Sequence, residues 1–109
     1  MTSVILTVVL TLAQPVQVSG HPMTPGTYEM RVTDQRPPAP SGAPNETQRV
    51  VEFVTNGTVV AREVAEVFPP TGARSDRATV QLLKGGEFVR IAANGADGRY
   101  LVYLPVSQP

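Results

Sequence analysis

Apolar and polar residues alternate with a period of two over several short stretches of this chain. In residues 27–33, for example, Tyr28, Met30 and Val32 alternate with polar side chains. This is the pattern of a strand with one buried face. Proline and glycine separate these stretches, and none of the longer ones has a regular helical period. We therefore predict about six strands, at 27–33, 49–55, 58–67, 78–84, 87–93 and 99–104.

An Asn-Gly dipeptide at 56–57 predicts a tight hairpin between the second and third of these strands. Both central residues of a type I′ turn need a positive φ, which asparagine and glycine tolerate. Such a turn would place Phe53 opposite Val60 and Val54 opposite Val59. The end of the second strand of this hairpin is ambiguous, because residues 61–68 would also suit one or two turns of helix.

A Gly-Gly dipeptide at 85–86 predicts a second hairpin with a two-residue loop. The loop would pair Lys84 with Glu87 and Leu82 with Val89. One face would then be wholly apolar, with Val80, Leu82, Val89 and Ile91. The other face would be mixed, with Gln81, Leu83, Phe88 and Arg90. A slip of one residue would destroy this separation, so the register is well specified.

The mixed face of this hairpin supplies the candidate binding residues, which are Leu83, Phe88 and Arg90. A β-sandwich buries more than one sheet face, so we expect Leu83 and Phe88 to belong to a second core layer. If both were exposed instead, they would form an apolar patch suited to a partner. The last strand is apolar on both faces and is therefore expected to lie inside the sheet.

These elements predict an all-β fold, either a small antiparallel β-sandwich or a partly open barrel of about six strands. Two long proline-rich loops, at 36–45 and 69–77, would connect the strands. A length of 109 residues suits one domain. The domain is expected to occupy residues 21–109.

Residues 1–20 are predicted to be a signal peptide. Residues 4–13 are apolar apart from Thr7 and Thr11, and this run is shorter than the roughly 20 residues that span a membrane. Small residues precede two candidate cleavage points, after Ala13 and after Gly20. The segment lacks an early lysine or arginine, however, so an extra N-terminal strand and a membrane anchor stay open. Cleavage would make the protein secreted or periplasmic, with no transmembrane span in the mature chain.

Charge and composition exclude several functional classes. The nine basic and nine acidic residues cancel, and the basic ones are scattered along the sequence, so we predict no nucleic-acid binding. The chain contains no cysteine, which rules out disulfides, thiolate nucleophiles and cysteine-ligated zinc.

Candidate catalytic and metal-binding residues are few. His21 is the only histidine, and one imidazole without neighbouring ligands is a very weak metal site. Glu52 and Glu63 would lie nearly opposite each other on one face of the Asn-Gly hairpin. Two such carboxylates would share a proton or a cation, or would simply form a solvated face. The sequence has neither a nucleophile elbow nor a glycine-rich phosphate loop, so we predict no catalytic residues and no cofactor.

We therefore expect a non-enzymatic binding or accessory module, whose partner is a protein, a glycan or a small ligand. A self-associating structural component of the cell envelope is the alternative. A small hydrolase or a metal-dependent enzyme is a more distant third.

Overall fold

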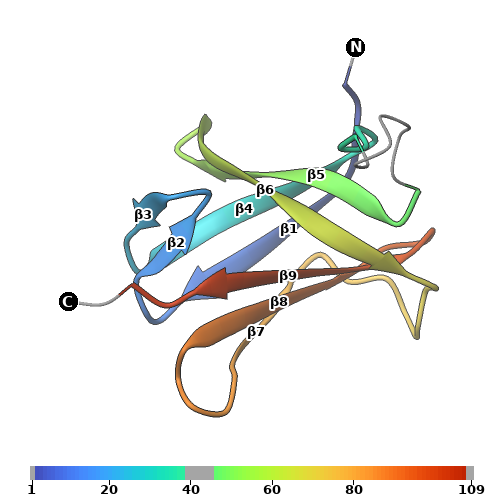
Figure 1. The fold of residues 1–109 in the computed structure, drawn as a ribbon. Coiled ribbons are helices and arrows are strands. Elements are labelled where there is room, and N and C mark those ends of the chain that lie inside the picture. Colours follow the sequence, from blue (N-terminus) through green and yellow to red (C-terminus); the bar gives the residue numbers. More distant parts are fainter. Residues whose placement is uncertain (1, 39–45, 108–109) are drawn as a thin grey trace.

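The computed structural model describes residues 2–38 and 46–107. Within these residues the chain forms nine strands and no helix: β1 (Val4–Leu12), β2 (Val16–Val18), β3 (His21–Met23), β4 (Gly26–Thr33), β5 (Gln48–Thr55), β6 (Thr58–Phe68), β7 (Thr79–Leu82), β8 (Phe88–Asn94) and β9 (Arg99–Pro105). Seven of them form one antiparallel sheet in the order β1-β4-β5-β6-β9-β8-β7, while β2 and β3 form a separate hairpin. The large sheet curls into a partly open barrel (Figure 1), so the predicted fold class is confirmed.

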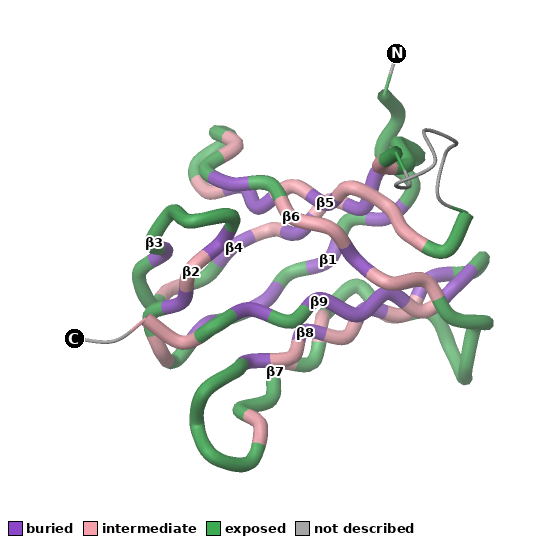
Figure 2. The backbone as a smooth tube through the Cα atoms, viewed as in Figure 1, coloured by how far each residue is buried: buried purple, intermediate pink, exposed green. Residues whose placement is uncertain are grey.

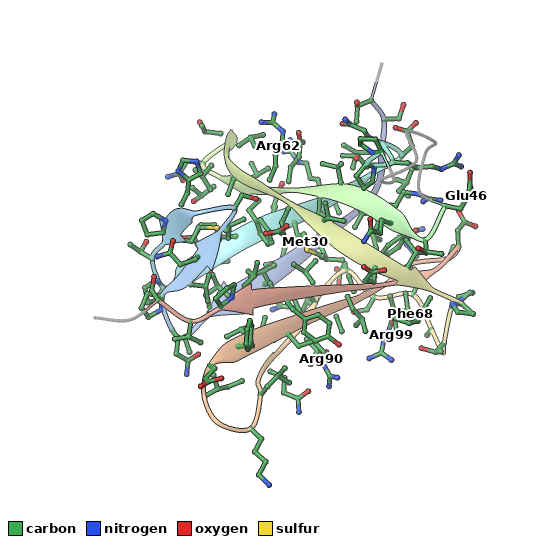
Figure 3. The ribbon with its side chains drawn as sticks, viewed as in Figure 1. Met30, Glu46, Arg62, Phe68, Arg90 and Arg99 are labelled. Carbon is green, nitrogen blue, oxygen red and sulfur yellow. The ribbon has the colours of Figure 1, made fainter. Side chains whose placement is uncertain are left out.

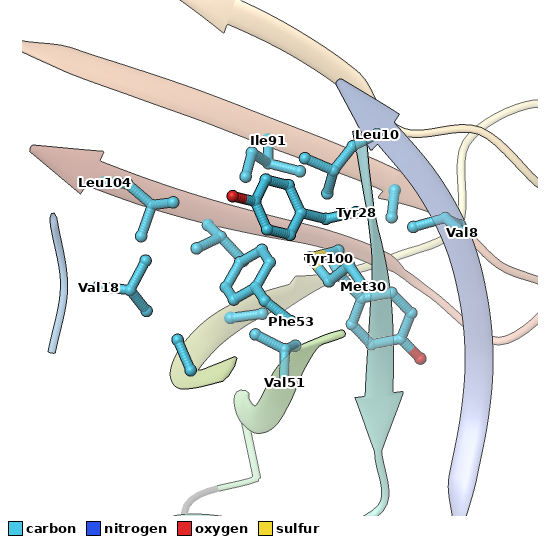
Figure 4. Close-up of a cluster of buried hydrophobic side chains, with 14 of the residues drawn as sticks. Val8, Leu10, Val18, Tyr28, Met30, Val51, Phe53, Ile91, Tyr100 and Leu104 are labelled. Carbon is cyan, nitrogen blue, oxygen red and sulfur yellow. The ribbon is translucent and has the colours of Figure 1, made fainter. Parts of the chain in front are cut away.

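The inner face of the curled sheet carries the hydrophobic core. Buried residues alternate with more exposed ones along most of the strands (Figure 2), as expected where successive side chains point to opposite faces of a sheet. Val8, Met30 and Phe53 are among the fully buried residues. Side chains from β1, β4, β5, β8 and β9 converge on this cluster (Figure 4). One sheet therefore encloses the core, and its outer face stays in contact with solvent.

Residues 4–12, for which a signal peptide was predicted, form strand β1 at the end of the sheet. Val8 lies opposite Met30 and Leu10 lies opposite Tyr28, and the pairing with β4 runs along the whole strand. Leu6, Val8, Leu10 and Leu12 point into the core. The arrangement is that of the alternative expectation, an extra N-terminal strand. Export of the chain and cleavage within residues 1–20 stay predictions.

The hairpin of β2 and β3 fills a gap between β6 and β9. These two strands pair only where Glu66–Phe68 of β6 meets Arg99–Leu101 of β9, and they separate beyond that point. Val16 of the hairpin forms a bridge with Val106, and the Ser19 hydroxyl donates a hydrogen bond of 2.8 Å to the Arg62 carbonyl. Val16, Val18 and Met23 add to the core from this side.

The Asn-Gly hairpin forms between β5 and β6. Its register is the predicted one as far as the pair Val54 and Val59, and it shifts by one residue at the next pair. Asn56 and Gly57 have φ values of 52° and 76°, and Val54 lies opposite Val59 as predicted. Phe53, however, lies opposite Ala61 because a β-bulge accommodates Val60. A bulge adds one residue to one strand only, and a hydrophobic pattern does not reveal it. The helical alternative for residues 61–68 is wrong, because β6 extends to Phe68.

The Gly-Gly hairpin has the predicted register and a longer loop. Leu82 lies opposite Val89, as predicted for the paired strands. The Leu83 amide donates to the Phe88 carbonyl over 2.9 Å, and the Gly86 amide donates to the Leu83 carbonyl over the same distance. Residues 84–87 therefore form the loop, and Lys84 and Glu87 lie in it rather than forming a pair between strands.

The two edge strands of the sheet meet in parallel at a short seam. Neighbouring strands alternate in direction, so the first and the last of seven antiparallel strands must run the same way. The Val9 amide donates to the Asp76 carbonyl over 2.9 Å, and the Ala78 amide donates to the Val9 carbonyl over 2.9 Å. The pairing ends there, and a hollow of about 240 Å³ separates the strands beyond it, next to Thr11 and Val80. The proline-rich loop at 69–77 leads into this seam, whereas residues 39–45 of the other predicted loop lie outside the described residues.

A substitution in β1 tests whether this strand is part of the folded protein. Leu10 is 2% exposed, whereas its neighbour Val9 is 37% exposed on the other face. Leu10→Ala should lower the free energy of unfolding by about 2–5 kcal/mol, because it leaves a cavity in the core. Val9→Ala, the matched control, should change it by about 0.5 kcal/mol or less. Urea unfolding of the full chain measures both, and equally small effects would show that β1 contributes nothing to the core.

Tyr100 should make the protein less stable in alkali. Burial raises the pKa of the Tyr100 hydroxyl above its ordinary 10.0, while Arg49 lowers it and Asp97 raises it by smaller amounts. The folded state therefore holds this proton more tightly than the unfolded chain does. Its contribution to stability is complete below pH 10.0 and is lost as the pH rises further.

Tyr100→Phe should flatten the loss of stability above about pH 10, since the group that ionises is gone. Thermal unfolding measured at a series of pH values between neutral and strongly alkaline checks this. Tyr103→Phe is the control, because Tyr103 is 46% exposed. Superimposable profiles for the wild type and Tyr100→Phe would contradict the expectation.

Candidate functional site

Three large aromatic side chains are exposed on the outer face of β6, β8 and β9. Phe68 is 46% exposed, Phe88 43% and Tyr103 46%. The sheet register places Phe68 opposite Arg99 and Tyr103 opposite Arg90, so an arginine adjoins two of these three rings. We call this group the outer patch; it consists of Phe68, Phe88, Arg90, Arg99 and Tyr103. Figure 3 shows Phe68, Arg90 and Arg99 on the same side of the molecule.

The candidate binding residues from the sequence lie on this face, but two of them do not form the predicted second core layer. Phe88 is 43% exposed and Leu83 is half-buried, so the expectation that both belong to the core is wrong. A single curled sheet has no second sheet to cover its outer face. Leu83 and Phe88 are hydrogen-bonded across the hairpin, and Arg90 follows two residues later on the same side. The structure thus brings all three together.

Leu101 gives the outer patch an apolar base. It is 9% exposed, yet it is not a member of the core cluster on the inner face. It lies on β9 between Arg99 and Tyr103, opposite Ala92 of β8. An apolar residue covered by neighbours on the solvent side indicates that this face is itself partly desolvated.

Arg90 and Arg99 form no ion pair with an acidic residue in the described part of the chain. Among the described residues, the ion pairs are those of Arg31 with Glu29, Arg36 with Glu46 and Arg62 with Glu52. The Arg90 guanidinium instead donates a hydrogen bond to the Gln81 side-chain carbonyl. The outer patch therefore carries two positive charges with no ion-paired carboxylate.

A hollow of about 100 Å³ lies on the outer face beside these arginines. Its lining comes from β7, β8 and β9: Thr79, Gln81, Arg90, Ala92, Asn94 and Arg99. Within the described part of the chain, two buried side-chain polar atoms lack a hydrogen-bond partner, Asn94 Oδ1 and Arg99 Nε. Both residues line this hollow, and they are directly opposite each other in the sheet. Buried polar atoms are normally paired, so these two indicate that a water molecule or another polar group completes the hydrogen bonding beside this hollow.

The predicted acidic and metal-binding residues are not brought together. Because of the bulge at Val60, Glu52 lies opposite Arg62, and their side chains form an ion pair of 3.1 Å. Glu63 lies opposite Val51 on the other face of the sheet, so the predicted facing of Glu52 and Glu63 is wrong. His21 is exposed at the start of β3. Residues 2–38 and 46–107 contain no grouping of three or more side chains suited to a metal ion.

Sequence reasoning missed Phe68, Arg99 and Tyr103. Phe68 joins the outer patch through the pairing of β6 with β9, which are distant in sequence. Arg99 and Tyr103 join it through the pairing of the consecutive strands β8 and β9. The available signal was the second apolar face of the last strand, which contains Leu101 and Tyr103. This second apolar face predicts an internal strand, which β9 is, and it also forms part of the outer patch.

No family model, curated protein or solved structure matches this chain. The described residues also include no helix long and apolar enough to cross a membrane.

Proposed function

We propose that this protein is a non-enzymatic binding module that docks a protein partner on the outer patch. The observation that carries the proposal is the exposure of Phe68, Phe88 and Tyr103 on one sheet face. Aromatic residues and arginine are the types most enriched in the cores of protein interfaces. They also supply most of the residues whose truncation weakens binding strongly.

The charge of the outer patch indicates the chemistry of the partner. Arg90 and Arg99 are not ion-paired with any carboxylate of the described residues. Glu66 lies on the same face, and its carboxylate accepts a hydrogen bond of 2.7 Å from Gln48. A partner surface with acidic side chains among apolar ones would therefore complement the patch.

Substitutions in the outer patch should abolish binding without affecting the fold. The double variant Phe88→Ser and Tyr103→Ser removes two exposed rings, and neither ring is part of the core. The partner would be isolated with the full chain and purified. Calorimetry with the purified partner should then show affinity reduced at least about tenfold, as expected for truncated interface anchors.

Val60→Ser is the matched control for this experiment. Val60 is 41% exposed, but it lies at the bulge of β6, away from the patch. Its affinity should stay within about twofold of the wild type, since isolated surface changes have small effects. If the control lost as much affinity as the double variant, the outer patch would not be the binding surface.

Self-association is a second candidate, favoured by the free edge of β7. Leu82 is 46% exposed, although its partner Val89 is buried on the inner face. Beyond Ala78 no strand pairs with this edge among the described residues. An unpaired strand edge is a template for pairing with another chain.

Sedimentation measured over a wide range of protein concentration separates the two candidates. A concentration-dependent dimer that Leu82→Lys disrupts would support pairing of two copies through β7, because a charge on an edge strand opposes such pairing. A monomer at every concentration would rule it out. The outer patch double variant should leave this result unchanged.

A further inference from the structure

We infer that the hollow beside Asn94 and Arg99 is a carboxylate-binding site, and that it receives an aspartate or glutamate side chain of the partner. The identity of the partner rests on the proposed function. The existence of a carboxylate site does not, because it follows from groups of this chain alone.

One hydrogen-bond donor and one acceptor without partners lie on opposite residues beside the hollow. Arg99 Nε carries a hydrogen to donate, and Asn94 Oδ1 accepts one. Both atoms are buried and belong to opposite residues of β8 and β9. An acidic residue in a peptide supplies both complements, because its carboxylate accepts from Arg99 and a nearby backbone N–H donates to Asn94. A lone cation or an apolar group would not satisfy both atoms, whereas a water molecule would, so the choice of a carboxylate rests on the charge of the hollow.

The charge of the hollow favours an anionic group. Arg90 and Arg99 both line the hollow, and neither forms an ion pair with a carboxylate in the described part of the chain. The planar guanidinium matches a carboxylate in geometry, and hydrogen bonds between these groups are stronger than those between neutral ones. Gln81 accepts a hydrogen bond from Arg90 and so holds that side chain at the hollow. The Thr79 hydroxyl is a further donor in the lining.

The size and position of the hollow favour a side chain of a partner over a cofactor. Sites for small molecules usually enclose roughly 300–1,000 Å³. This hollow measures about 100 Å³, which fits one functional group rather than a cofactor. Phe68 lies opposite Arg99 and Tyr103 opposite Arg90, so exposed rings adjoin the site. The segment that fits is therefore an acidic residue with apolar neighbours.

The test uses the full chain and a minimal probe, a glutamate blocked as N-acetyl and N-methylamide. This probe carries one carboxylate and backbone N–H groups. The blocked glutamine, which lacks the charge, is its matched comparison. Proton–nitrogen NMR would follow the Arg99 Nε–H signal and the Asn94 side-chain amide during titration. Both should shift in a saturable manner with blocked glutamate, with an affinity about tenfold higher than that for blocked glutamine.

Two variants place the binding at this hollow. Arg99→Lys keeps the charge but removes the Nε donor, and Asn94→Asp supplies an internal carboxylate of nearly the same shape. Each should weaken binding of blocked glutamate about tenfold. Arg74→Lys, in the exposed loop before β7, should leave it unchanged. Amide spectra of the core residues would confirm that both variants are folded.

The outcomes separate the inference from the proposed function. Saturable shifts that both hollow variants weaken would establish the carboxylate site, whatever the partner proves to be. Absent shifts, equal binding of blocked glutamine, or inorganic phosphate bound about tenfold more tightly than glutamate would overturn the inference. In one further outcome, the outer patch double variant loses binding to the partner while Arg99→Lys retains it. That result would support the proposed binding function and would contradict the inference that an acidic side chain of the partner enters this hollow.

Discussion

The core of this protein is enclosed by one curled sheet, and therefore the core side chains lie on one face of that sheet, while Leu101 is buried on the other. This constraint decides what the rest of the molecule does. β1 must supply apolar residues from one edge, and the hairpin of β2 and β3 must fill the opening where β6 and β9 separate. The outer face has no covering layer, so the large apolar residues found there are exposed to solvent.

The sequence was informative wherever pairing is local. The hairpin of β7 and β8 has the predicted register, because its apolar face leaves only one alignment that buries Val89. The turn at Asn56 is also determined locally, because asparagine and glycine tolerate the positive φ values that it needs. The bulge at Val60 could not be foreseen, since it changes register without changing composition. Residues 4–12 were ambiguous because a buried strand and the apolar part of a signal peptide require the same residue types.

The candidate site was predicted only in part, for a related reason. Leu83, Phe88 and Arg90 belong to one hairpin, and their shared face followed from alternation. Phe68 joins them through the pairing of β6 with β9, which are distant in sequence, and no local pattern encodes that pairing. Arg99 joins them through the pairing of the consecutive strands β8 and β9. Whether such residues are buried or exposed depends on the number of layers in the fold. The alternation of apolar and polar residues along a strand does not reveal how many layers the fold has. The prediction that Phe88 belongs to the core is wrong for this reason.

The loop at 69–77 is the single covalent link between two sets of strands. β1 to β6 precede it and β7 to β9 follow it, and the two sets meet through the short pairing of β6 with β9, the seam at Val9 and the bridge of Val16 with Val106. A chain cut in this loop would yield two fragments whose contacts are all noncovalent and complementary. Reassembly of two such fragments would therefore depend on these pairings and on the hydrophobic core that both sets of strands share.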